Sequence, residues 1–452
     1  SVVESLAKLV SAGFRREDLP AVPGATLAGL AARGAGSIAQ AGEALKKADE
    51  EIAALASEAA GPLAAAGAAL EREAALAAAE RSAGGTAAAS LISAWLPEDS
   101  AGAAARSLGA DGPCAAEIRR PLPGEEVPVL LRPSRLLRPF ALLVSTYGLP
   151  KYGEVEPTAF AAAAFLLMFG MMFGDAGHGA IVCAAGLWLA RRPGGRAAVG
   201  RVMCWCGLSA VLFGLLYGSY FGLARFRPYA LWRDPLEGDP LALVTAAAVF
   251  GAAVISLGVA LNVVNRARLG DKAGALLGRF GAAGLLFYWS GLLWAAGFAP
   301  ARLALPLMAL GAACWLIKEP ASYMLRGRAA HSGTEGGLAA IAAESAVGAF
   351  EGALLYLANT VSFVRLAAYA MSHAALLAAA YALAGAADKV WGQGSAAGIL
   401  AAVLGNAAAI GLEGLVAGVQ ALRLEYYEFF GKFLEGEGRP FRPFTLGVKG
   451  GS

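Results

Sequence analysis

Hydrophobic residues change their pattern along the chain near residue 158. From there onward, long apolar segments alternate with short polar connectors, which is typical of a helical protein that crosses a membrane several times. We therefore predict a mainly α fold, a polytopic membrane protein with about eight transmembrane helices. Their expected ranges are 158–173, 178–191, 197–223, 241–264, 274–299, 302–325, 345–386 and 394–430.

The connectors between these segments differ in charge. Basic residues gather in every second connector and after the last segment, at Arg191, Arg192, Arg196, Arg201, Arg266, Arg268, Lys272, Arg279, Arg326, Arg328, Lys432, Arg439 and Arg442. The positive-inside rule places these connectors and both termini in the cytoplasm. The bias holds only if 158–173 and 178–191 are two short helices around the glycine-rich turn GDAGHG. This charge bias is incomplete, because the third and fifth connectors also contain arginine.

The last two apolar segments are longer than a bilayer requires. A helix over 345–386 would be about 63 Å long at about 1.5 Å per residue, whereas the hydrocarbon core is about 30 Å thick. We predict that both helices tilt strongly against a large curved partner. The alternative is that their ends extend into water.

Polar residues on these two segments follow helical spacing. On the first they fall within an arc of roughly 100°, at Glu344, Glu351, Ser362, Arg365, Tyr369, Ser372 and His373. On the second, Asn406, Glu413, Gln420 and Tyr427 recur every seventh residue, with Arg423 one turn beyond Gln420. Ionisable residues inside a membrane are expensive and usually mark an ion pathway. Each residue alone could instead form a polar contact between helices.

Residues 1–135 lack this membrane pattern. The alanine-rich stretch from Gly34 to Ser82 has apolar residues at heptad spacing on both sides of Gly61-Pro62. It predicts a helical hairpin, either a weak coiled coil or two solvated amphipathic helices. Residues 89–135 predict a small α+β lobe. The expected domains are a cytosolic arm (1–135), a transmembrane ion-translocating domain (136–446) and a tail (447–452).

Composition supports an integral membrane protein. Of the 452 residues, 58% are hydrophobic and 16% are charged, and the mean hydropathy is +0.57. The net charge of +3 does not indicate a nucleic-acid partner. The five cysteines are expected to be small apolar residues, and we expect no metal site and no cofactor. Without a GxxxxGK[ST] motif the chain is not expected to be an enzyme by itself.

Five motifs resemble one family, the membrane stator subunit (subunit a or subunit I) of V-type and A-type rotary ATPases. They are YGLPKYGEVEPT (147–158), MFGDAGHG (172–179), LFGLLYGSYFG (212–222), FEGALLYLANTVSFVRLAAYAMSHAALL (350–377) and LEGLVAGVQALRLEYYEFFGKFLEGEGRPFRPF (412–444). The resemblance covers about 147–446. The N-terminal part resembles only the second half of the family's cytosolic arm, so the predicted arm is incomplete.

The resemblance implies roles for the ion-translocation candidates. Arg365 would face a rotating ring of proteolipid (c/K) subunits, and Arg423 would be the second arginine. Glu351, His373 and Glu413 would serve two aqueous half-channels, and Asp175 and His178 belong to the signature turn. Many relatives carry an acid where Ser219 stands, so its role stays open.

The resemblance also implies the setting of these roles. The chain would exchange H⁺ or Na⁺ with the ring and couple ion flow to ATP hydrolysis or synthesis in a bacterial or archaeal plasma membrane. Its arm would meet the peripheral stalk and the soluble V1/A1 sector. Neither the ion nor the direction follows from the sequence. A secondary ion-coupled transporter is the alternative function, although the chain shows no repeated halves. A purely structural anchor would not need an intramembrane arginine.

Overall fold

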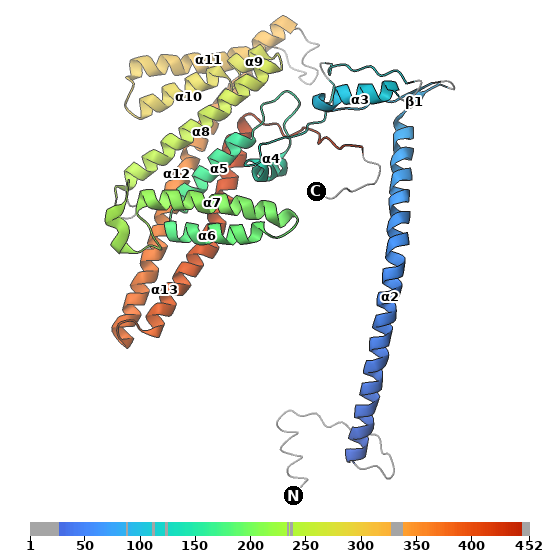
Figure 1. The fold of residues 1–452 in the computed structure, drawn as a ribbon. Helices are drawn as coiled ribbons and strands as arrows, with labels where there is room; N and C mark the ends of the chain where they lie inside the picture. The colour runs from blue at the N-terminus through green and yellow to red at the C-terminus, as the bar shows by residue number, and fades with distance from the viewer. Residues whose placement is uncertain are drawn as a thin grey trace. The chain divides into compact units, whose positions relative to one another are not determined.

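The computed structural model describes residues 27–86, 89–110, 114–122, 125–232, 235, 238–326 and 338–444 (Figure 1). Contacts divide the chain into two units, Ser1–Ala94 with Pro443–Ser452, and Trp95–Arg442. The boundary between them, at residues 94 and 95, falls inside the segment 89–135 that was predicted to form one α+β lobe. The functional boundary expected at residue 135 stays a prediction.

The first unit is dominated by one helix, α2 (Leu27–Ser82), of 56 residues. Two short strands follow, β1 (Gly84–Gly85) and β2 (Ser90–Leu91), which pair antiparallel. The predicted hairpin at Gly61-Pro62 is wrong, because α2 continues through Pro62. Proline costs about 3 kcal/mol in a helix, but the alanine-rich sequence on both sides favours helix strongly enough to continue it.

The helix α2 has a second property that the hairpin prediction missed. Between Gly34 and Arg81 it is long and apolar enough, by length and composition, to cross a membrane. Its heptad residues are exposed in the structure, with Ile38 at 75% and Leu70 at 71%. The cytosolic placement of this arm therefore stays a prediction.

The second unit is mainly helical, as predicted. It begins with α3 (Glu98–Ala110), η1 (Arg138–Phe140) and α4 (Ala141–Tyr147). The apolar helices are α5 (Thr158–Met172), α6 (Ala176–Ala190), α7 (Gly195–Tyr217), α8 (Pro240–Arg268), α9 (Lys272–Leu277), α10 (Ala282–Ala295), α11 (Ala301–Arg326), α12 (Leu338–Trp391), α13 (Ala396–Ala408) and α14 (Gly414–Leu424). Among the described residues of the whole chain, 7 helices are long and apolar enough to cross a membrane, and α5 and α6 are shorter.

Several short turns connect or extend these helices. The 3₁₀ turn η2 (Ala224–Tyr229) follows α7. Two π-helical turns, η4 (Ala409–Glu413) and η5 (Glu425–Phe429), flank α14, and η6 (Phe430–Lys432) ends the last helix. The sequence did not predict the π turns. Each adds one residue to a helical turn and so changes which side chains share a face.

The helices α5 and α6 are separate, as the charge pattern predicted. α5 ends at Met172 and α6 begins at Ala176. α6 packs on α7 through glycines, with almost no space between the backbones. A Cβ added at Gly207 would lie 2.4 Å from the Cys183 backbone nitrogen, and one at Gly200 would lie 2.4 Å from that of Ala190. Small residues allow this close approach between membrane helices.

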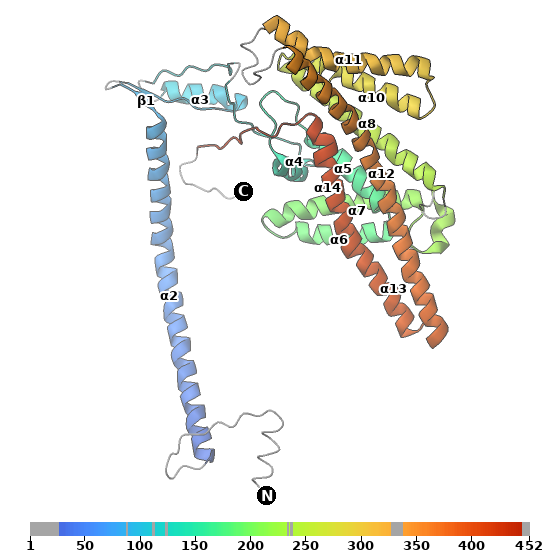
Figure 2. The same ribbon diagram turned by 180° about the vertical axis from the view of Figure 1, so that it is seen from behind.

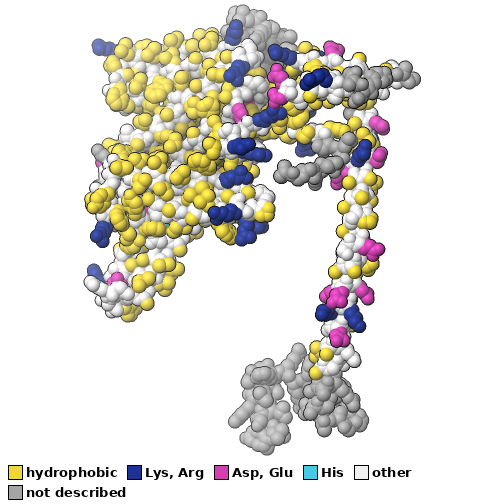
Figure 3. Space-filling model, viewed as in Figure 1, with side chains coloured by type: hydrophobic (Ala, Val, Ile, Leu, Met, Phe, Trp, Pro, Cys, Tyr) yellow, Lys and Arg dark blue, Asp and Glu magenta, His cyan; other side chains and the backbone are white. Residues whose placement is uncertain are grey.

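The last two helical segments are over-long, as predicted. α12 has 54 residues, and Ala396–Lys432 forms a second run of 37 residues. The two lie side by side and cross the direction of α6, α7, α10 and α11 obliquely (Figures 1 and 2). This crossing agrees with a strong tilt relative to the other membrane helices. Figure 3 shows apolar side chains over most of this unit, with Lys and Arg mainly at its margins.

A polar junction fixes the end of the last helix. Lys151 forms ion pairs with Glu435 and with Glu437, and these carboxylates raise the pKa of Lys151. The Asn265 side chain accepts from the Val155 N–H at 2.8 Å and donates to the Phe433 carbonyl at 3.3 Å. The loop before α5, the end of α8 and residues 433–437 after the last helix therefore hold one another in place.

Candidate functional site

Asp175 organises the turn between α5 and α6. Its side chain is completely buried and caps α6 by accepting the His178 N–H at 2.9 Å. It also accepts from the Ser219 hydroxyl at 2.6 Å and from the N–H groups of Phe221 and Gly222, both at 3.0 Å. Four donors therefore surround one carboxylate. Ser219, whose role the sequence left open, contributes a hydroxyl that donates to Asp175.

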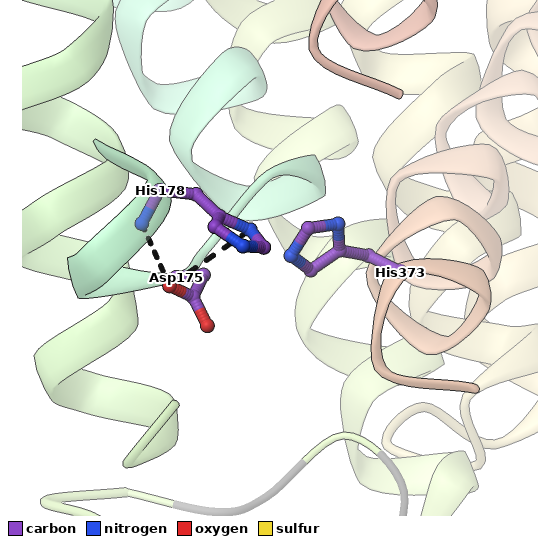
Figure 4. A group of neighbouring side chains, drawn as sticks. All are labelled: Asp175, His178 and His373. Carbon is purple, nitrogen blue, oxygen red and sulfur yellow. Dashed lines mark hydrogen bonds and ion pairs between the residues drawn. The ribbon is translucent and has the colours of Figure 1, made fainter. Parts of the chain in front are cut away.

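Two histidines meet beside this turn, one from α6 and one from α12 (Figure 4). The ring centroids of His178 and His373 are 5.4 Å apart. His178 Nε2 lies 2.8 Å from the Asn406 side-chain oxygen, and His373 Nδ1 lies 2.5 Å from a Glu413 carboxylate oxygen. We call the five residues Asp175, His178, His373, Asn406 and Glu413 the histidine cluster. It joins the signature turn to both long helical segments.

A second polar group surrounds Arg365. The Arg365 guanidinium donates to the Gln420 side-chain oxygen at 3.3 Å. The carboxylate of Glu428 interacts electrostatically with Arg365 and Arg423, and Ser362 is its hydrogen-bond partner. Glu428 is 5% exposed, whereas Arg423 lies on the exposed side of α14. We call Ser362, Arg365, Gln420, Arg423 and Glu428 the arginine cluster.

Aromatic residues of α5 and its C-terminal end pack beside the histidine cluster and against Gly414 and Gly418 of α14. Phe173 is completely buried, and its ring centroid lies 5.0 Å from that of His373. Phe169 packs next to it at a tilt of 45°, with the ring centroids 5.6 Å apart. Arg365 and His373 are eight residues apart on α12, or about 12 Å along a helix axis. The two clusters are thus separate polar sites on one pair of helices.

The predicted site residues therefore fall into three groups. The structure brings Asp175, His178, His373 and Glu413 together, whereas Ser362, Arg365 and Arg423 each interact with Glu428. Glu351 belongs to neither group. It is exposed and forms an ion pair of 2.9 Å with Arg279, which precedes α10.

Three charged residues near the end of the last helix, Glu425, Glu428 and Lys432, are buried, although the sequence pattern did not single out the two glutamates and placed Lys432 after the last apolar segment. Glu425 is completely buried, and both of its carboxylate oxygens lack a hydrogen-bond partner among the described residues. Lys432 is 4% exposed, and its ammonium lies 5.0 Å from the centroid of the Phe280 ring. The available signal was the placement of these charges in an aromatic run, EYYEFFGKF. Because the π turn at 425–429 shifts the positions of the side chains around the helix, a regular helical projection does not place these residues on the buried face.

Helices, apolar surface and buried polar clusters together define a multi-pass membrane protein whose ionisable residues lie between its long helices. Residues 91–197 match the V-type ATPase 116kDa subunit family. The similarity extends further in an alignment with one A-type relative, over 72% of this chain.

Curated relatives agree with this assignment. The chain is 31% identical to an A-type ATP synthase subunit I from Aeropyrum pernix, over 72% of this chain and 52% of the relative. It is 30% identical to the subunit I of Thermococcus kodakarensis, over 71% of this chain and 48% of the relative. It is also 30% identical to the subunit I of Halobacterium salinarum, over 68% of this chain and 49% of the relative. The chain spans about half the length of the curated relatives it matches.

Proposed function

We propose that this chain is the ion-translocating stator subunit of an A-type ATP synthase in an archaeal or bacterial plasma membrane. In this role it contributes no nucleotide site. It exchanges H⁺ or Na⁺ with carboxyl groups on a rotating proteolipid ring. The observation that supports this most directly is the pair of separate ionisable clusters along α12 and the last helical run, with Phe169 and Phe173 packed beside them.

The arginine cluster is the proposed point of contact with the ring. A guanidinium stays charged at every working pH and can hold a carboxylate through two hydrogen bonds. An opposite charge within a few ångströms favours the ionised carboxylate and hence release of its cation. Arg365 donates to the neutral Gln420, and Glu428 lies close enough to balance part of its charge. Arg365 therefore keeps donors for a partner carboxylate.

The two clusters would end two half-channels. His373 and Glu413 lie beside Phe173, and Arg365 lies eight residues before His373 on α12. A hydrated ion does not cross packed aromatic side chains, because desolvation of a charge is costly. Ions would then pass from one half-channel to the other only on a ring carboxyl. Glu351, paired with Arg279, would lie at an outer entrance.

The surface beside these clusters suits a membrane-embedded partner. Large apolar side chains on both long segments are strongly exposed, such as Val361 on α12 at 60% and Leu415 on α14 at 67%. Figure 2 shows α12, α13 and α14 in front of the other helices of this unit. A proteolipid ring would cover this face. The arm would contact peripheral-stalk subunits and the soluble sector, and lipid would cover the remaining apolar surface.

Disulfide crosslinking in native membranes tests this proposal. We expect Val361→Cys and Leu415→Cys to crosslink to a small proteolipid that carries an intramembrane acid. A matched control is Val249→Cys on α8, where Val249 is 64% exposed but lies on another helix. Crosslinks from Val249→Cys alone, or no proteolipid in the purified complex, would contradict the proposal.

A further inference from the structure

The histidine cluster contains two buried ring nitrogens whose bonding is incomplete. His178 Nδ1 and His373 Nε2 are buried and have no hydrogen-bond partner among the described residues. The side chain of His178 is completely buried, and that of His373 is 5% exposed. Unpaired buried polar atoms of this kind are rare and need an explanation.

Neighbouring residues determine which nitrogen of each ring carries the proton. The Asn406 amide nitrogen donates to the Ala402 carbonyl at 2.8 Å and to the Tyr381 hydroxyl at 3.2 Å, so its oxygen faces His178. An amide oxygen only accepts hydrogen bonds, and His178 Nε2 is therefore the donor. Its Nδ1 then carries a lone pair in the neutral ring.

The same reasoning applies to His373. The Glu413 carboxylate accepts from His373 Nδ1 at 2.5 Å, which leaves a lone pair on Nε2 of the neutral ring. Asp175 adds a third ligand group, because its Oδ1, which also accepts the N–H groups of His178 and Phe221, lies 4.0 Å from His178 Nδ1. One ligand atom from each of Asp175, His178 and His373 lies within 4.8 Å of the others (Figure 4). Three bases therefore converge, and no donor among the described residues lies between the two imidazole nitrogens.

We infer that Asp175, His178 and His373 form a binding site for a divalent transition metal of the Zn²⁺ class. Imidazole nitrogen and carboxylate oxygen are ligands that Zn²⁺ prefers, at about 2.0–2.2 Å. Tetrahedral ligands at that distance are about 3.4 Å apart, so the side chains must close by little more than about 1 Å. A water molecule would complete the coordination from the small cavity bordered by Gly174, Ser219, Gly222 and His373.

The surroundings of the two rings resemble those of known metal ligands. A metal-bound histidine usually donates its other ring N–H to a carboxylate or carbonyl, which orients the ring and raises its basicity. In the same way, His373 donates to the Glu413 carboxylate and His178 donates to the Asn406 side-chain oxygen. No metal was expected from the cysteine spacing, and these three ligands come from two motifs almost 200 residues apart. Bound metal would link the signature turn to α12.

Direct metal binding tests the inference without any measurement of transport. The full chain, purified in detergent with a histidine-free tag and stripped of metal, is titrated with Co²⁺ and then with Zn²⁺. We expect one saturable Co²⁺ site with intense visible absorption typical of four-coordinate Co²⁺, and stoichiometric displacement by Zn²⁺. His373→Gln and His178→Gln should each lower the affinity at least tenfold. Glu413→Ala should lower it about 10–100-fold through the lost N–H partner.

Two controls keep the result specific. His331, which lies outside the described residues, completes the set of 3 histidines in the chain, and His331→Gln should bind like the parent. Cys183 and Cys204 are a competing pair, since their sulfurs are 3.3 Å apart, and Cys204→Ala should leave the Co²⁺ spectrum unchanged. No saturable site in the parent chain would overturn the inference, as would sulfur-to-cobalt charge-transfer bands or loss of binding only in the His331 variant.

Discussion

Asp175 should stabilise the fold far more than an ordinary helix cap. Asp239 is a matched comparison, because it also caps a helix, α8, but it is exposed and accepts one N–H, that of Leu241. Removing such a cap costs about 1 kcal/mol. Asp175→Ala would remove the same cap and also leave the donors of Ser219, Phe221 and Gly222 without their acceptor.

The difference between the two variants can be worked from these contacts. Each buried donor left unsatisfied costs about 1–3 kcal/mol. Since water enters such a site only partly, we expect Asp175→Ala to lose about 3–6 kcal/mol, against about 1 kcal/mol for Asp239→Ala. Asp175→Asn should fall between them, because its amide retains one of two accepting oxygens.

A thiol-reactive fluorophore added during heating measures this difference. Cys183, Cys204 and Cys206 lie in α6 and α7, and Cys206 is 5% exposed. They should therefore report unfolding next to Asp175, whereas the exposed Cys114 reacts at once. We expect a clear fall in the melting temperature for Asp175→Ala and almost none for Asp239→Ala. Equal shifts in the two variants would refute the four-donor account.

Three further predictions concern other parts of the second unit. Glu428→Gln should slow ion transport about tenfold, equivalent to about 1.4 kcal/mol in the barrier, without loss of assembly, because it removes the negative charge beside the arginines. Vesicle transport assays measure this, and Glu98→Gln at an exposed position of α3 should be neutral. Gly207→Ala should cost about 1–3 kcal/mol by overpacking, detectable as lower thermal stability, whereas Gly195→Ala should have little effect because a Cβ there meets nothing within 4 Å. The pKa of Asp271 is lowered by the N–H of Gly274, with Arg266 as a further partner. The stability it gives to α9 should thus be present above the ordinary value of 3.8 and be lost as the pH falls through its lower folded pKa; hydrogen exchange of the first turn of α9 should show this, and constant protection down to pH 2 would contradict it.

The sequence predicted the helices of the second unit well, because long apolar segments leave few alternatives. It also placed Arg365 and His373 on α12 and Glu413 and Arg423 on the final helical run. It could not show that Asp175 and His178 meet His373 and Glu413, since helical projection compares residues only within one helix. Tertiary packing alone decides that contact.

The errors have local physical causes. The Gly61-Pro62 pair predicted a turn, but the alanine-rich sequence around Pro62 continues the helix. Glu351 shares the predicted face of α12 with Arg365, yet it pairs with Arg279, a residue whose position depends on the packing of α10. Glu428 was missed because a π turn moves it inward toward the arginines.

Ion transport by the assembled complex tests the central claim, that Arg365 exchanges ions with a partner carboxyl. The complex is reconstituted into vesicles with Arg365→Ala, Arg365→Lys or, as a control at the exposed end of α8, Arg268→Ala. We predict normal assembly for all three, no coupled transport for Arg365→Ala or Arg365→Lys, and normal transport for Arg268→Ala. Lysine should fail because it lacks the planar fork and can lose its charge near a buried site. Sustained coupled transport by assembled Arg365→Ala would contradict the account.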